Sequence, residues 1–260
     1  MEKPKRGNEQ LAQQKSMTPR RGDHLVSKSS GSLLALARRC SLGELLIWPC
    51  SSPPLGLLSA SLQMASPSAL IQRGMQLFRE LNLAASLEVF DSLYAAHQQL
   101  QPQLWQRGLA LYYANRFAEG AAQFRLDAAA YNTADAEEAI WACLCESRLE
   151  GGLPAARARM LAVGQDPRPV LRIALRVFRG EAGAEELAQA GAASAHDSFY
   201  ALLYEGLLLE AQGNAPASAR AISSALASPY AASSSDFMVS VARMHEKQRR
   251  GAEGTSAGPD

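Results

Sequence analysis

The chain has 260 residues, of which 47% are hydrophobic and 20% charged, with a formal net charge of +1. This is ordinary globular composition, and the abundance of Ala and Leu, both strong helix formers, favours an all-α fold of one or two domains. Residues 1–66 hold nine Lys/Arg against four Asp/Glu, whereas residues 67–250 hold seventeen against nineteen, so the body lacks the concentrated basic face of a nucleic-acid binder.

The first segment, residues 1–66, shows no helical period. It is basic and rich in Ser, and Arg38, Arg39 and several prolines interrupt its apolar stretch at 32–62. No run reaches the roughly eighteen apolar residues of a membrane span, so we expect no transmembrane helix. A basic, acid-poor leader resembles an organelle transit peptide, which implies a plastid or mitochondrion, and otherwise the cytoplasm. The alternatives are a disordered extension or an upstream start codon chosen in error, with Met64 as the true start.

The main pattern begins after residue 66 and repeats with a period of 34. Residues 71–90, IQRGMQLFRELNLAASLEVF, align with residues 105–124, WQRGLALYYANRFAEGAAQF. The identities that return 34 residues later are Gln72, Arg73, Gly74, Leu77 and Phe90.

The repeated glycines predict close contact between two helices. A side chain at Gly74 or Gly108 would push a pair of crossing helices apart, which justifies a helix-propensity cost of about 1 kcal/mol each. Phe90 and Phe124 are expected on the second helix of each pair, filling the space between neighbouring pairs.

Two more helix pairs are expected further along the chain. The segment 137–161 predicts a divergent third pair with Ala142 at the crossing position. The segment 200–230 predicts a fourth pair, with Gly206 at the crossing position.

The register of the repeat is interrupted between residues 163 and 198. Gly206 follows Gly108 by 98 residues, which is not a multiple of 34. We expect two shorter helices in the interval, a closing helix over 233–248, and a disordered polar tail over 249–260.

A period of 34 with these glycine and phenylalanine positions is typical of the tetratricopeptide repeat (TPR), which residues 67–248 resemble. The resemblance implies an all-α, right-handed solenoid of three to four antiparallel helix pairs plus additional helices. More narrowly, QRGLALYYANR and the irregular later helices resemble adaptors of the bacterial new-lipoprotein-I type. Neither Cys40 nor Cys50 follows the small and apolar residues that a lipoprotein needs, so lipid anchoring is not carried over.

The sequence contains no recognisable catalytic motif, so we expect no enzyme activity, no cofactor and no metal. His196, Asp197 and Ser198 are adjacent, whereas catalytic triads meet in space, so we expect a helix N-cap at Asp197 or Ser198. The four histidines are scattered. Cys143 and Cys145 lie two apart on a predicted helix and point in different directions, which favours a buried structural role.

The resemblance implies a functional surface on the concave side, where the first helix of each pair lines a groove. The residues at the groove positions of the first two pairs are Ile71, Met75, Phe78, Trp105, Leu109 and Tyr112. The third pair supplies Ala139, Cys143 and Glu146. A solenoid has no second layer over this face, so we expect Phe78, Trp105 and Tyr112 to be partly exposed and to suit an apolar peptide or helix. The alternative is that several are core residues or are covered by the leader.

These features predict a non-catalytic adaptor or scaffold that binds a protein or peptide through its groove, with a homodimer as one possible assembly. The alternative is a regulatory or enzyme-associated helical domain that binds a small anionic ligand. Arg168, Arg172 and Arg176, spaced four apart, could form its binding strip. A structural assembly subunit is a third interpretation.

Residues 67–248 are expected to fold without residues 1–66, because the repeat begins only after that segment. Circular dichroism of the truncated chain should show strong helix and a cooperative melting transition. An unfolded truncated chain would mean that the leader belongs to the core.

Overall fold

The computed structural model describes residues 66–131 and 135–255, and every regular element in these ranges is helical. This confirms the all-α class. Residues 1–65, which are all but the last residue of the expected leader (1–66), and residues 256–260 lie outside the described part of the chain. Among the described helices, none combines the length and the apolar character needed to cross a membrane.

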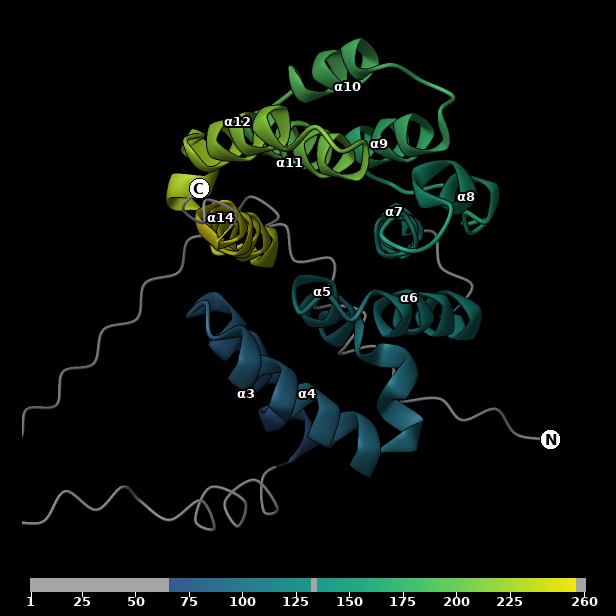
Figure 1. Ribbon diagram of the computed structural model, residues 1–260, viewed down its shortest axis with the longest axis vertical. Helices are drawn as coiled ribbons and strands as arrows, with labels where there is room; N and C mark the ends of the chain where they lie inside the picture. The colour runs from purple at the N-terminus through teal and green to yellow at the C-terminus, as the bar shows by residue number, and fades with distance from the viewer. Residues whose placement is uncertain (1–65, 132–134, 256–260) are drawn as a thin grey trace, which may run out of the picture. The chain divides into compact units, whose positions relative to one another are not determined.

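Twelve α-helices and one short 3-10 helix follow one another in the described ranges (Figure 1). They are α3 (Pro67–Arg79), α4 (Leu83–Ala96), η1 (Gln98–Gln103), α5 (Trp105–Tyr113), α6 (Phe117–Tyr131), α7 (Ala136–Glu146), α8 (Gly152–Ala158), α9 (Pro169–Arg179), α10 (Ala184–Gly191), α11 (Ala195–Ala211), α12 (Ala215–Leu226), α13 (Pro229–Ser233) and α14 (Phe237–Thr255). The last helix therefore continues past residue 248, where the tail was expected to begin.

Three helix pairs, α3–α4, α5–α6 and α11–α12, cross at the same kind of contact. In each pair a glycine on the first helix faces a large side chain sixteen residues later on the second. The contacts are Gly74 with Phe90, Gly108 with Phe124, and Gly206 with Ile222. A Cβ added at any of these glycines would lie only 2.6 to 2.8 Å from the facing side chain, so the glycine leaves the space that this side chain fills.

The same turn joins the two helices of all three pairs. Leu81, Asn115 and Gly213, each seven residues after the pair's glycine, have φ values of 59°, 58° and 80°. The next backbone N–H donates to the carbonyl five residues earlier at 2.8 to 2.9 Å, the hydrogen bond that closes a Schellman motif. Asn82 and Asn214 then cap the second helix of their pairs through their side-chain oxygens.

The pair α7–α8 diverges from this pattern. Ala142 on α7 is fully buried, but the turn is longer and passes through Gly151 at a φ of 85°. Beyond it, α9 and α10 pack against each other and against α11.

Helix α11 begins earlier than the sequence indicated. Ser194 is its N-cap and accepts a hydrogen bond from the Asp197 backbone at 3.0 Å, so the expectation of a cap at Asp197 or Ser198 is wrong. The reason is that a serine three residues upstream already satisfies the helix terminus.

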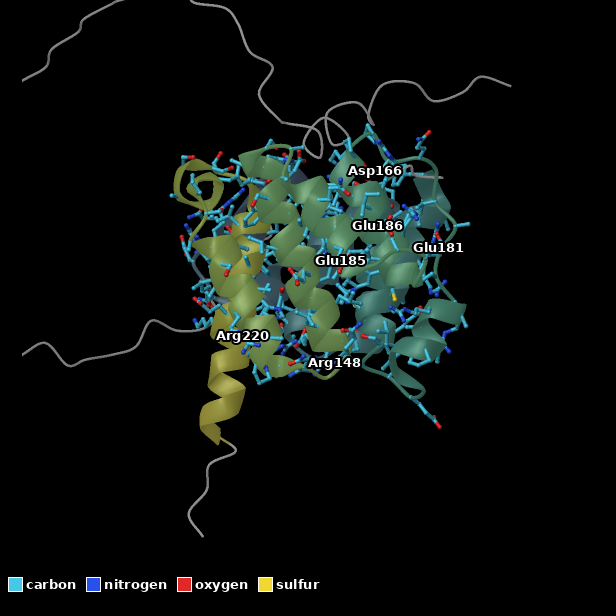
Figure 2. All side chains as sticks on the ribbon, turned by 90° about the horizontal axis from the view of Figure 1, so that it is seen from above. Arg148, Asp166, Glu181, Glu185, Glu186 and Arg220 are labelled. Atoms are coloured by element: carbon cyan, nitrogen blue, oxygen red, sulfur yellow. The ribbon has the colours of Figure 1, made fainter. Side chains whose placement is uncertain are left out.

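Helix α14 lies between α12 on one side and α3 and α5 on the other (Figure 1). Its first half is nearly all buried, from Phe237 to His245 with the exception of Arg243. Its C-terminal turns project beyond the neighbouring helices (Figure 2). The last helix of the chain thus closes the space between the first helix pairs and the last.

Gly108→Leu is expected to destabilise the fold by about 1–3 kcal/mol, because the new side chain must displace the Phe124 ring. Urea denaturation measures the change. The matched control is Gly183→Leu, since a Cβ at the exposed Gly183 meets nothing within 4 Å. Equal stability of the Gly108 variant and the wild type would contradict the close crossing.

Candidate functional site

The predicted groove residues of the first two helix pairs are mostly core residues. Five are buried: Ile71, Met75, Phe78, Leu109 and Tyr112. Phe78 is 0% exposed and Tyr112 1%, so the expectation that these two side chains are partly exposed is wrong. Trp105 alone of the six is half-buried. Ala139, Cys143 and Glu146 on the third pair are buried as well.

Helix α14 covers the part of this face that α3 and α5 form. The Phe237 ring lies 5.2 Å from the ring of Phe78 and 5.7 Å from that of Trp105, measured between centroids. Lys247 donates to the carbonyl of Leu81 at 2.9 Å, at the turn that ends α3. A helix from the same chain therefore lies where the sequence analysis placed a partner.

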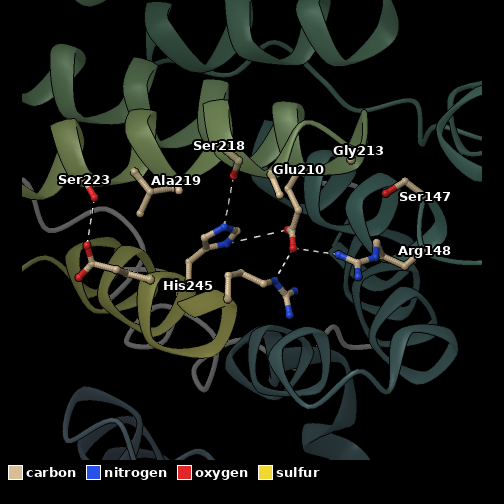
Figure 3. Close-up of a pocket in the computed structure, with 13 residues that line it drawn as sticks. Ser147, Arg148, Glu210, Gly213, Ser218, Ala219, Ser223 and His245 are labelled. Carbon is tan, nitrogen blue, oxygen red and sulfur yellow. Dashed lines mark hydrogen bonds and ion pairs between the residues drawn. The ribbon is translucent and has the colours of Figure 1, made fainter. Parts of the chain in front are cut away.

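A cavity of about 560 Å³ opens on the other side of α14, against α11, α12 and the turn after α7 (Figure 3). Its lining combines small apolar residues with charged and hydroxyl side chains. The lining residues are Ser147, Arg148, Glu210, Ala211, Gly213, Ala215, Ser218, Ala219, Ile222, Ser223, His245, Glu246 and Arg249. We call this cavity the Glu210 pocket.

The Glu210 carboxylate on α11 binds groups from three other parts of the fold. It accepts hydrogen bonds from the Tyr112 hydroxyl on α5 and from Arg148 at 2.8 Å, and it forms an ion pair with Arg249 on α14. The His245 Nδ1 atom on α14 lies 3.9 Å from one of its oxygens. Burial alone would raise the pKa of this carboxyl, but these neighbours outweigh burial and hold the pKa below its usual value.

Ser218, His245 and the Glu210 carboxylate lie in a row, as the three residues of a hydrolase catalytic triad do (Figure 3). The position of Ser218 is nevertheless explained by helix packing. Ser218 follows Gly206 by twelve residues, as Ser86 follows Gly74, and both serines are buried. Ser86 donates to the Gly74 carbonyl at 2.8 Å, which shows the same small side chain filling the same crossing position. The Ser218 hydroxyl lies 3.5 Å from the histidine Nε2 atom, at the long limit of a hydrogen bond.

The three arginines considered as an anion-binding strip are engaged by the protein itself. Arg168 forms ion pairs of 2.7 to 2.9 Å with three carboxylates, among them Asp166. Arg172 donates to the backbone carbonyl of Asp166 at 2.7 Å, and Arg176 pairs with Glu186 at 3.0 Å. The three guanidinium groups join α9 to neighbouring segments of the protein. Their engagement does not favour an anion-binding site on α9.

Nothing in the sequence predicted that the partners of Glu210 would meet. Glu210 is separated from Tyr112 by 98 residues and from Arg148 by 62. Only the stacking of helix pairs and the return of α14 bring these side chains together.

Cys143 and Cys145 are both buried and free, and burial raises the pKa of Cys143 to about 11. Both thiols are thus held in the neutral form at pH 7. Within residues 66–131 and 135–255, no group of His, Cys, Asp and Glu side chains is arranged to hold a metal ion.

Comparison with known proteins assigns no family: no family model matches the chain, and no curated protein shows significant sequence similarity to it.

His245 predicts how stability depends on pH. Burial lowers its pKa from 6.5 to about 4, so the unfolded chain binds the proton more tightly and stability falls as the pH drops below 6.5. From this group alone, the free energy of unfolding should be about 2 kcal/mol lower at pH 5 than at pH 7.

Urea denaturation of the wild type and of His245→Gln at both pH values tests this expectation. Carboxyl groups that do not contact residue 245 contribute equally in both chains. The glutamine variant should lose about 2 kcal/mol less than the wild type between pH 7 and pH 5. If the stability of both chains depended on pH in the same way, His245 would not be the group responsible.

Proposed function

We propose that residues 67–248 form a right-handed, TPR-like solenoid that acts as a non-catalytic scaffold and binds a protein helix in its concave groove. The observation that carries the proposal is the repeated joint: three helix pairs share one glycine crossing and one left-handed turn. Stacked helix pairs of this kind present a continuous concave face, which is the usual peptide-binding surface of helical repeats.

The chemistry of the groove follows from what α14 presents to it. Phe237 contacts Phe78 and Trp105, and Arg79 lies over the Phe237 ring at 5.2 Å. An aromatic anchor in an apolar pocket, flanked by a cation, is the arrangement found at many helix-in-groove interfaces. The partner class that best fits is therefore an amphipathic helix with an aromatic residue at its N-terminal end, which competes with α14 for the same face.

A labelled peptide of residues 235–249 tests this proposal without any knowledge of the natural partner. In the wild type the tethered α14 competes with the peptide, whereas Phe237→Ala removes the main anchor of the tethered helix. The full-length Phe237→Ala chain should bind the peptide at least about tenfold more tightly than the wild type, measured by fluorescence anisotropy.

Arg243→Ala is the matched control chain, since Arg243 lies on the exposed face of the same helix. It should behave as the wild type, and a peptide that itself carries Phe237→Ala should bind weakly to all chains. If folded Phe237→Ala binds the peptide no better than the wild type, the groove does not act as a helix-binding surface. Phe237→Leu provides a milder variant for the same comparison.

A further inference from the structure

We propose that the Glu210 pocket is a second binding site, for a small monocarboxylate with a compact hydrocarbon body. The site is separate from the groove of α3 and α5 and goes beyond the scaffold function. It rests on three features of the pocket: its size and lining, its charge, and its hydrogen-bond donors.

The pocket has the size and the mixed lining of a small-molecule site. Its volume of about 560 Å³ falls within the roughly 300–1,000 Å³ of such sites. One wall, on α11 and α12, is formed by the small apolar residues Ala211, Ala215 and Ala219 together with Ile222. This wall would receive the hydrocarbon body of a ligand while the charged end of the pocket holds its polar group.

The charged end of the pocket carries an excess of one positive charge. Arg148 and Arg249 face a single carboxylate, that of Glu210. Burial keeps His245 neutral at pH 7, so it adds no charge. Glu246 also lines the pocket, where it accepts a hydrogen bond from the Ser223 hydroxyl at 3.1 Å, so the lining as a whole is neutral and the positive excess belongs to the cluster of Arg148, Arg249 and Glu210. A monoanion would neutralise the excess, whereas a dianion would reverse it.

The donors at this end exceed the acceptors. The Nη2 atom of Arg249 is buried and has no hydrogen-bond partner among the described residues. Arg148 binds Glu210 through Nη1, and its side chain, which lines the pocket, is 32% exposed. Carboxylates accept paired hydrogen bonds from guanidinium groups. A buried donor without an acceptor is unfavourable, and a carboxylate bound at Arg249 would supply the missing acceptor.

Aromatic rings orient both guanidinium groups. Arg148 lies over the Phe117 ring at 5.0 Å, and Arg249 lies 5.6 Å from the ring centre of Tyr112. These contacts reduce the rotational freedom that each arginine would lose on binding. The anion-binding group is therefore largely preformed.

Isothermal titration calorimetry of the full-length chain with sodium butyrate at pH 7 tests the proposal. Sodium chloride at equal ionic strength is the blank, and the neutral amide butyramide is the isosteric control. We expect saturable binding of butyrate, no binding of butyramide, and weaker binding of inorganic phosphate because it is partly dianionic. An acetylated Ala-Ala dipeptide with a free carboxylate tells whether the site prefers a peptide terminus to a free acid, and tighter binding of the dipeptide than of butyrate would overturn the assignment to a small free acid.

Arg148→Gln should weaken butyrate about tenfold, since it removes one guanidinium and the excess charge. Arg148→Lys retains the charge and should lose less. The matched control is Arg220→Gln, because Arg220 is exposed on α12 and does not line the pocket (Figure 2). Circular dichroism establishes that each variant is folded. Equal affinity for butyrate and butyramide, or unchanged butyrate binding by folded Arg148→Gln, would overturn the proposal.

Discussion

The buried carboxylate of Glu210 connects the beginning, the middle and the end of the helical domain. Tyr112 belongs to the second helix pair, Arg148 to the turn of the third, and Arg249 to the last helix. A carboxylate that is only 9% exposed is costly to bury unless charged and hydrogen-bonding groups surround it. The position of α14 satisfies that requirement, so the electrostatics of one residue and the packing of the closing helix depend on each other.

The repeated joints explain how the two helices of each pair are held together. Each crossing places a backbone against a ring or a branched side chain, and each turn reverses the chain with the same left-handed residue. Leu81 adopts this conformation without being glycine, at a cost that the following hydrogen bonds and the asparagine cap offset. This local geometry depends on only a few residues in each pair. The pair α11–α12 therefore has the same crossing and turn although it is out of the 34-residue register.

Helix α14 builds two different surfaces. Its N-terminal turn carries Phe237 into the face formed by α3 and α5, while His245 and Arg249 line the Glu210 pocket. The helix has a stripe of apolar residues on one face and polar residues on the adjacent face, so its two faces contact different surroundings. One helix therefore both covers the face of α3 and α5 and lines the Glu210 pocket.

The sequence alone determined the local features: the all-α class, the glycine crossings and the break in register before Gly206. These depend on residues close in the chain, whose propensities and spacing act locally. It placed Phe78 and Tyr112 on the groove side but could not tell that α14 would cover them, because apolar residues suit a binding groove and a core equally well. Only the tertiary structure decided that question, and only it assembled the pocket, since Tyr112, Arg148, Glu210 and Arg249 meet through contacts between residues up to 98 positions apart.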